Sequence, residues 1–210
     1  MREWGLAEHG AVLGLQLSSC ALGQFDALLR LLAKWNRVYN LTSLQDEVEW
    51  VSHHFLDSLS ILKLLPSGLL LDVGSGGGFP GVPIAIANPE REVVLLDSNL
   101  KKTAFLRQVV AELSLRNVTV ATTRVEDFDP DRVFDVVVSR AFSDLQTFLR
   151  LGARLCRQDG TLLAMKGAYP ADELACLPHA SIEKVVKLEV PLLGKQRHAV
   201  FLRPVTPMEG

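Results

Sequence analysis

The sequence of 210 residues contains only three cysteines, and they lie far apart, at Cys20, Cys156 and Cys176. An odd number of cysteines without a Cys-x-x-Cys pair indicates neither a disulfide framework nor a zinc site. We therefore expect no bound metal and a reducing compartment, the cytoplasm.

Long apolar runs are also absent. No stretch approaches the roughly 20 residues that a membrane-spanning helix needs. The first residues, Met1–Trp4, show no basic head followed by an apolar run, so we expect neither a signal peptide nor a membrane partner.

An excess of positive charge is missing as well, because the formal net charge is −2. A protein that holds nucleic acid by its overall charge is usually basic. Any polyanion must therefore be bound by a local patch. The composition, with 48% hydrophobic and 22% charged residues, is typical of a globular chain. Separately, we expect a monomer.

The first part of the chain has a helical pattern. Apolar residues recur at steps of three and four between Leu22 and Trp35, and again from Val48 to Leu65. Residues 40–43 break the first pattern, and Pro66-Ser67-Gly68 ends the second. We predict an N-terminal helical extension over residues 1–66.

Residues 67–210 show a different pattern, in which short apolar segments typical of strands alternate with segments typical of helices. The expected strands are 69–73, 93–96, 118–122, 134–139, 161–165, 182–190 and 198–202, and the main helices are 84–87, 101–115 and 145–156. This alternation predicts a doubly wound α/β fold, with a mostly parallel seven-stranded sheet and an antiparallel edge strand. Ligands of such sheets bind at the carboxyl ends of the strands.

The strongest motif runs from Asp72 to Gly81, where a strand enters a glycine-rich loop. Glycine lets the backbone turn with positive φ and lets a ligand approach closely. The pattern Gly76-x-Gly78-x-x-Gly81 also fits a dinucleotide fingerprint, but it begins farther from the end of the strand than that fingerprint does. The acid followed by Gly74, Gly76 and Gly78 fits the first motif of class I methyltransferases better. An acid there suits S-adenosylmethionine, which carries an ammonium and a sulfonium.

Two later strand ends carry further candidates for cofactor contacts. Asp97 can accept the ribose hydroxyls, and Ser98 follows it directly. The alternative is a helix N-cap, because Asp97, Ser98 and Asn99 are all capping types. Val125 and Glu126 follow the third strand, where the adenine edge would lie; a solvated loop is the alternative.

The turn Ser139–Phe142 follows the fourth strand, where the methyl acceptor should sit. It lacks the Asn/Asp-Pro-Pro-aromatic turn typical of enzymes that methylate exocyclic amines, and no cysteine lies at a strand end to attack a pyrimidine carbon. A ring nitrogen such as N7 of guanine needs neither device, because its lone pair attacks the methyl group directly. Arg140 could orient the base, a phosphate or the cofactor carboxylate without a general base; its alternative is a surface salt bridge.

With these motifs, the sequence resembles the RsmG (GidB) family of bacterial ribosomal RNA methyltransferases. The matching segments span nearly the whole chain: Trp35-Asn36, Asn40–Thr42, His54–Leu59, Asp72–Gly81, Leu96–Ser98, Lys101-Lys102, Phe105-Leu106, Arg124–Glu126, Ser139–Phe142 and Ala164–Gly167. The resemblance implies a class I, Rossmann-like methyltransferase fold and methylation of guanine 527 at N7 in 16S rRNA of the small ribosomal subunit. It also implies cofactor contacts at Gly74, Phe79, Val125, Glu126 and Arg140. A basic residue is frequent in the family where His53 stands.

Several basic residues are candidate RNA contacts, although most such residues only solvate a helix face. They are Lys101, Lys102, Lys166 and Arg197, with Arg107 and Lys195 as similar cases. The adjacent His53 and His54 point to different helix faces and cannot share a metal. Two rival functions remain open, a nicotinamide-dependent oxidoreductase and an RNA-binding ribosome-assembly factor with a vestigial cofactor site.

Overall fold

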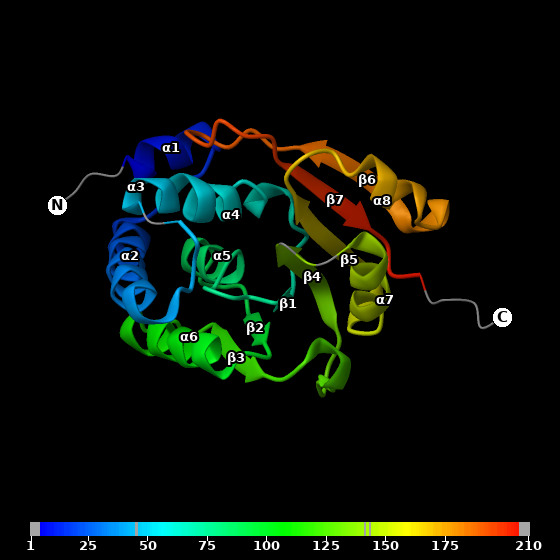
Figure 1. The fold of residues 1–210 in the computed structure, drawn as a ribbon, viewed down its shortest axis with the longest axis horizontal. Helices are drawn as coiled ribbons and strands as arrows, with labels where there is room; N and C mark the ends of the chain where they lie inside the picture. Colours follow the sequence, from blue (N-terminus) through cyan, green and yellow to red (C-terminus); the bar gives the residue numbers. More distant parts are fainter. Residues whose placement is uncertain (1–4, 45, 141, 143, 206–210) are drawn as a thin grey trace.

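The computed structural model describes residues 5–44, 46–140, 142 and 144–205, and helices cover both faces of a central sheet (Figure 1). The sheet has seven strands in the order β3-β2-β1-β4-β5-β7-β6. Strand β7 runs antiparallel to both neighbours, β5 and β6, and lies beside the edge strand β6. The predicted fold class is thus confirmed. The strands are β1 (Leu70–Val73), β2 (Val93–Asp97), β3 (Val118–Thr122), β4 (Phe134–Arg140), β5 (Cys156–Lys166), β6 (Ile182–Lys187) and β7 (His198–Leu202).

The helical elements differ from the sequence prediction at two places. The helical pattern over 48–65 is divided among several short helical elements, and one of them is a π-helical segment. The helix expected over 145–156 ends at Ala153, and Cys156 instead begins β5 opposite Phe134. The elements are α1 (Leu6–Val12), α2 (Ser19–Tyr39), α3 (Glu47–Trp50), the π-helix η1 (Val51–Leu56), α4 (Asp57–Leu59), η2 (Leu62–Leu64), α5 (Gly81–Ala87), α6 (Leu100–Glu112), η3 (Val125–Asp127), α7 (Leu145–Ala153), α8 (Ala171–Ala175) and η4 (His179–Ser181).

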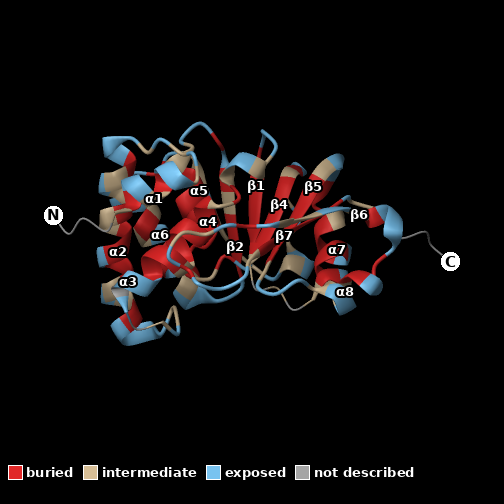
Figure 2. Cartoon of the chain, turned by 90° about the horizontal axis from the view of Figure 1, so that it is seen from above, coloured by how far each residue is buried: buried red, intermediate tan, exposed pale blue. Residues whose placement is uncertain are grey.

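The strands separate two apolar cores, because successive side chains of a strand point to opposite faces. In β1, Leu70 belongs to the core under α2, α5 and α6, whereas Leu71 belongs to the core under α7 and α8. In β4, Val136 and Val137 alternate in the same way. Figure 2 shows the central strands buried and the outer helix surfaces exposed. Strands buried on both faces explain the continuous apolar runs in the sequence.

The N-terminal helices pack directly on the α/β unit. Phe25 of α2 contacts Phe55 of η1 with ring centroids 5.3 Å apart, and both are almost fully buried. Trp35 contacts Phe105 of α6 at 5.5 Å, and its indole N–H donates to Gln108. These helices therefore share one core with α5 and α6. None of the helices within the described ranges is long and apolar enough to span a bilayer.

Two glycines with opposite surroundings test this packing. A Cβ at Gly81, at the start of α5, would stand 2.3 Å from Leu95 Cδ2 and 2.7 Å from Asp72 Oδ2. We expect Gly81→Ala to lower the free energy of unfolding by about 1–3 kcal/mol through overpacking. Gly23 lies on the exposed face of α2 with nothing within 4 Å. Gly23→Ala should raise the same quantity by about 0.5–1 kcal/mol, because alanine favours the helix.

Both variants would be measured by urea denaturation. A Gly81→Ala protein as stable as the wild type would contradict the close packing of α5 on β1 and β2.

Candidate functional site

The candidate site lies between β1 and β4. There the order in which successive strands are added to the sheet changes direction. Strands β2 and β3 extend the sheet on one side of this point, and β5 extends it on the other. Helices following the strands cover opposite faces on the two sides, which leaves a crevice at the carboxyl ends. Asp72, Asp97 and Arg140 all lie at these ends.

The glycine loop after β1 has three residues with positive φ: Gly74 (72°), Gly76 (56°) and Gly78 (93°). A Cβ at Gly78 would stand 2.7 Å from Val82 Cγ2, so this glycine is needed for packing within the protein. A Cβ at Gly74 would meet nothing within 4 Å, and at Gly76 only the Gly74 carbonyl at 3.8 Å. The first two glycines therefore present bare backbone to open space.

Asp72 holds the far end of the glycine loop with its buried side chain. Its side chain is fully buried, and Oδ2 accepts a hydrogen bond from the Gly81 N–H at 2.9 Å. Among the described residues, Oδ1 of Asp72 has no hydrogen-bond partner. Burial raises the pKa of Asp72 to about 7, although the Gly81 N–H and the charge of Arg140 oppose that rise. The unpartnered oxygen can accept a proton or face a cation.

Asp97 connects the end of β2 to the same loop. Its Oδ2 accepts from the Gly76 N–H at 2.9 Å, and its Oδ1 accepts from the Asn99 N–H at 2.8 Å. The N-cap of α6 is Asn99, whose Oδ1 accepts from the Lys101 and Lys102 N–H groups. Asp97 is therefore not itself the helix cap, and Ser98 between them is exposed.

Arg140, at the end of β4, lies inside a cluster of N-terminal residues. Its Nη1 donates to the His53 carbonyl at 2.8 Å, and its Nη2 lies 3.2 Å from His54 Nδ1. The guanidinium lies 5.2 Å from the Phe79 ring centre, and the Phe79 ring stacks on His54 at 4.5 Å. Asp57 pairs with Arg140 at 3.2 Å, so the predicted salt bridge exists but is buried. Ala141, within the predicted turn, lies outside the described residues.

His54 is held in its neutral form. Burial, followed by the charge of Arg140, lowers the pKa of His54 to about 3. Nδ1 lies 3.2 Å from Arg140 Nη2 and 3.1 Å from the His53 carbonyl. Because a guanidinium can only donate, a hydrogen bond with Arg140 makes Nδ1 the acceptor and leaves the proton on Nε2, which lies 2.8 Å from Thr42 Oγ1. His54 thus serves as a neutral polar partner rather than as a charge.

The turn with Val125 and Glu126 lies after β3 as predicted, in η3. Arg154 of the segment after α7 holds this turn, because its Nη2 donates to the carbonyls of Val125, Glu126 and Phe128. Arg154 could not be predicted from the sequence, because its partners lie 26–29 residues away in the chain.

The candidate RNA-binding residues divide into two groups. Lys101 and Lys102 lie at the exposed start of α6, and Lys101 Nζ is 5.8 Å from the Tyr39 ring centre. Lys166 is mostly buried and contacts both oxygens of Glu173, at 2.8 and 3.0 Å. Arg197 pairs with Asp57 at 2.9 Å. Lys101 is exposed and Lys102 lies 3.9 Å from Asp97 Oδ2, whereas Lys166 and Arg197 are largely buried in ion pairs.

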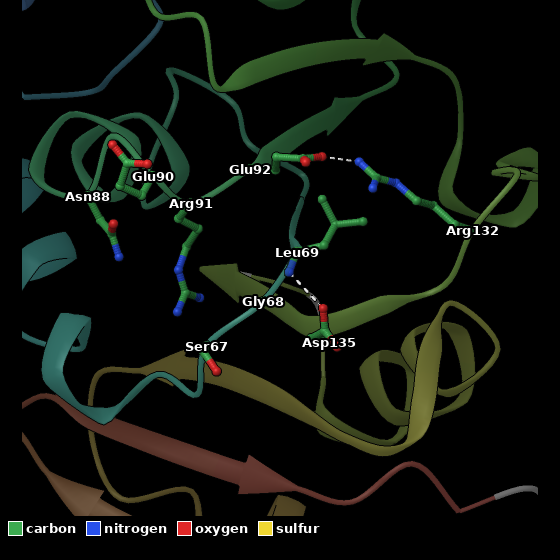
Figure 3. Close-up of a pocket in the computed structure, with 9 residues that line it drawn as sticks. All are labelled: Ser67, Gly68, Leu69, Asn88, Glu90, Arg91, Glu92, Arg132 and Asp135. Atoms are coloured by element: carbon green, nitrogen blue, oxygen red, sulfur yellow. Dashed lines mark hydrogen bonds and ion pairs between the residues drawn. The ribbon is translucent and has the colours of Figure 1, made fainter.

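A surface hollow of about 410 Å³ lies at the opposite edge of the sheet (Figure 3). Its residues precede β1, β2 and β4 or begin these strands, and so they lie away from the glycine loop. Glu92 pairs with Arg132, and Asp135 accepts from the Leu69 N–H. Arg91 Nε and Nη1 have no hydrogen-bond partner among the described residues. We nevertheless do not place the candidate site there, because ligands of doubly wound sheets bind at the carboxyl ends of the strands. The lining residues are Ser67, Gly68, Leu69, Asn88, Glu90, Arg91, Glu92, Arg132 and Asp135. Nowhere in the described ranges do three His, Cys, Asp or Glu side chains gather closely enough to hold a metal ion.

Comparison with known proteins identifies a family that matches nearly the whole chain. The family model described as rRNA small subunit methyltransferase G matches residues 21–200. A protein of that name from Chromobacterium violaceum is 50% identical over 90% of this chain and 92% of its own length. Its counterpart from Nitrosococcus oceani is 49% identical over 92% and 91%.

Solved structures share the fold at low identity. A SAM dependent methyltransferase from Aquifex aeolicus superposes with a TM-score of 0.57 at 19% identity, over 75% of this chain and 93% of that one. The P. horikoshii TYW2 in complex with MeSAdo gives 0.54 at 13% identity, over 70% and 61%. These likenesses establish a methyltransferase-like fold.

The opposite pKa shifts of His54 and Asp72 predict how stability depends on pH. Between about pH 4 and 6.5, the unfolded chain has a protonated His54 and an ionised Asp72, whereas the folded chain has a neutral His54 and a protonated Asp72. Each state binds one proton at the pair, so the two contributions cancel. In His54→Gln only the Asp72 contribution remains, and stability relative to the wild type should fall as pH rises. In Asp72→Asn only the His54 contribution remains, and stability relative to the wild type should instead rise with pH, by up to about 1.4 kcal/mol per pH unit.

Urea denaturation across this pH range measures both slopes, and each variant is the control for the other. Slopes of the same sign in the two variants would contradict the opposed shifts.

Proposed function

The chain belongs to the rRNA small subunit methyltransferase G family, and from this premise we propose that it methylates N7 of guanine 527 in the 16S rRNA of the small ribosomal subunit. The methyl donor is S-adenosylmethionine. The observation that carries the proposal is the open backbone at Gly74 and Gly76, bounded by two acids at the carboxyl edge of the sheet.

The residues at this edge fit the chemical groups of the cofactor. The free Oδ1 of Asp72 lies beneath the glycine loop, where positive charge on the ligand would stabilise the ionised carboxylate. Each oxygen of Asp97 has one N–H donor and can accept another hydrogen bond, as ribose hydroxyls require. We assign the adenine edge to Val125 and Glu126, and the remaining contacts to Phe79, Ser98 and Arg140.

The chemistry needs alignment rather than proton transfer. When bound, the cofactor supplies a methyl group on a positively charged sulfur. Guanine N7 has an in-plane lone pair and no proton, so no base has to act before attack. His54 could not act as that base near neutral pH, since it is buried and already has partners on both ring nitrogens. We assign Arg140 to orienting the reacting groups.

Cofactor binding can be tested at Gly74. In Gly74→Ala, the new Cβ would project into the open space that the proposal assigns to the cofactor. We expect affinity for S-adenosylhomocysteine, measured by calorimetry, to fall at least about tenfold, or 1.4 kcal/mol. The positive φ of 72° adds a stability loss of about 1–2 kcal/mol.

Gly194→Ala is the matched control. Gly194 also has positive φ (63°) and no atom within 4 Å, but it lies in the segment between β6 and β7. This variant should lose similar stability and bind the ligand normally. Equal affinity in both variants would remove the glycine loop from the cofactor site.

The reaction itself is tested by methyl transfer from labelled S-adenosylmethionine to small subunits that lack the modification, with free 16S rRNA in parallel. N7-methylguanine makes the RNA chain cleavable by reduction followed by aniline, so the modified base can be mapped. We expect one label, at guanine 527. The single-turnover rate with saturating cofactor should show no unit-slope loss toward acid pH, because no general base takes part.

Label on an exocyclic amine or a ribose hydroxyl would refute the N7 assignment. Binding to subunits without any transfer would support an RNA-binding assembly factor, and binding of NAD in place of S-adenosylhomocysteine would support an oxidoreductase.

A further inference from the structure

Asp57 is a buried carboxylate at which three distant segments of the chain meet. Its side chain is 1% exposed. Oδ2 accepts from Arg140 Nη1 at 3.2 Å, and Oδ1 accepts from Arg197 Nε at 2.9 Å. Asp57 begins α4, Arg140 ends β4, and Arg197 directly precedes β7. One carboxylate therefore ties the N-terminal helices to both arginines, 83 and 140 residues later.

The same helical segment surrounds the rest of the Arg140 guanidinium. The His53 carbonyl accepts from Nη1, the His54 ring accepts from Nη2, and the Phe79 ring lies against the guanidinium at 5.2 Å. His53, His54 and Asp57 come from one stretch of η1 and α4. Among these partners Asp57 alone carries a full negative charge, since His54 is neutral. Asp57 is therefore the partner that fixes the position of the charged Arg140 guanidinium.

The cluster contains two cations and one anion. The side chains of Arg140 and Arg197 are 21% and 20% exposed, so water screens them only partly. Removing the Asp57 charge would leave two guanidiniums facing each other without compensation. We expect the repulsion to displace Arg140, because its remaining contacts, with the His53 carbonyl, the His54 ring and the Phe79 ring, are all to uncharged groups.

We propose that Asp57 is a positioning residue for the methyl transfer: it holds the Arg140 guanidinium in the orientation that the reaction uses, and Arg197 holds Asp57 from its other oxygen. This inference rests on the proposed function. It gives the N-terminal helical segment a direct part in the chemistry, through a residue that contacts no reacting group itself.

The test is a double-mutant cycle of Asp57→Asn with Arg140→Gln. Asparagine keeps the shape of Asp57 but removes its charge. We expect the single-turnover rate at saturating cofactor and small subunits to fall on the order of 10–100-fold, as a displacement of about 1 Å can produce. The double variant should be no slower than Arg140→Gln alone, because Asp57 acts through Arg140. A merely structural Asp57 would give two losses that multiply, which would overturn the proposal, as would a wild-type rate in Asp57→Asn.

The control is Asp26→Asn, which removes an exposed ion pair with Arg30 on α2 and should leave the rate unchanged. If Asp57→Asn does not fold, Asp57→Asn/Arg197→Gln, whose cluster has the same net charge as in the wild type, is compared with Arg197→Gln. The double variant should again be 10–100-fold slower, and equal rates would overturn the proposal.

A second measurement does not depend on activity. The hydrogen bonds of Arg140 restrict rotation of its guanidinium, so its Nη signals should be resolved separately by nitrogen NMR in the wild type and merge in Asp57→Asn. Unchanged signals would overturn the role of Asp57. If the wild type transfers no methyl group, the proposed function fails, while this measurement still decides whether Asp57 fixes Arg140.

Discussion

The shape of the candidate site depends on one hydrogen bond, from the Gly81 N–H to the buried carboxyl group of Asp72. It joins the end of β1 to the start of α5 and so closes the glycine loop between them. A second acid, Asp97, receives the Gly76 N–H from the neighbouring strand. Both acids thus hold the loop backbone through hydrogen bonds within the protein.

Burial then decides which of the nearby groups carry charge. An imidazolium at His54 would face the Arg140 guanidinium at 3.2 Å, so the protein keeps that ring neutral. Asp72, with one N–H donor and one unpartnered oxygen, is held toward its protonated form. The charged groups that remain in this region are two acids, Asp57 and Asp97, and two arginines, Arg140 and Arg197.

Features that depend on neighbours in sequence could be predicted, and those that depend on distant partners could not. The strand His198–Leu202 and the loop after Asp72 were read correctly because apolar runs and glycines mark them locally. The first residues of β5, Cys156–Gly160, are mostly polar and exposed, and of these only Cys156 is paired with β4, opposite the distant Phe134. The ion pair of Lys166 with Glu173 could not be predicted, because nothing in the sequence indicates Glu173 as its partner. An acid within the apolar stretch Phe55–Leu59 was the available signal for Asp57.

The π-helical segment explains how one short stretch can reach Arg140 several times. In a regular α-helix, backbone carbonyls are used within the helix, and adjacent residues point in directions about 100° apart. The wider turn of η1 leaves the His53 carbonyl able to accept from Arg140, while the His54 ring and the Asp57 carboxylate meet the same guanidinium. Wide turns of this kind are common at functional sites. The interruption that the apolar periodicity did not predict is therefore where the N-terminal helices take part in the site. It follows that the helical segment and the α/β unit form the site together.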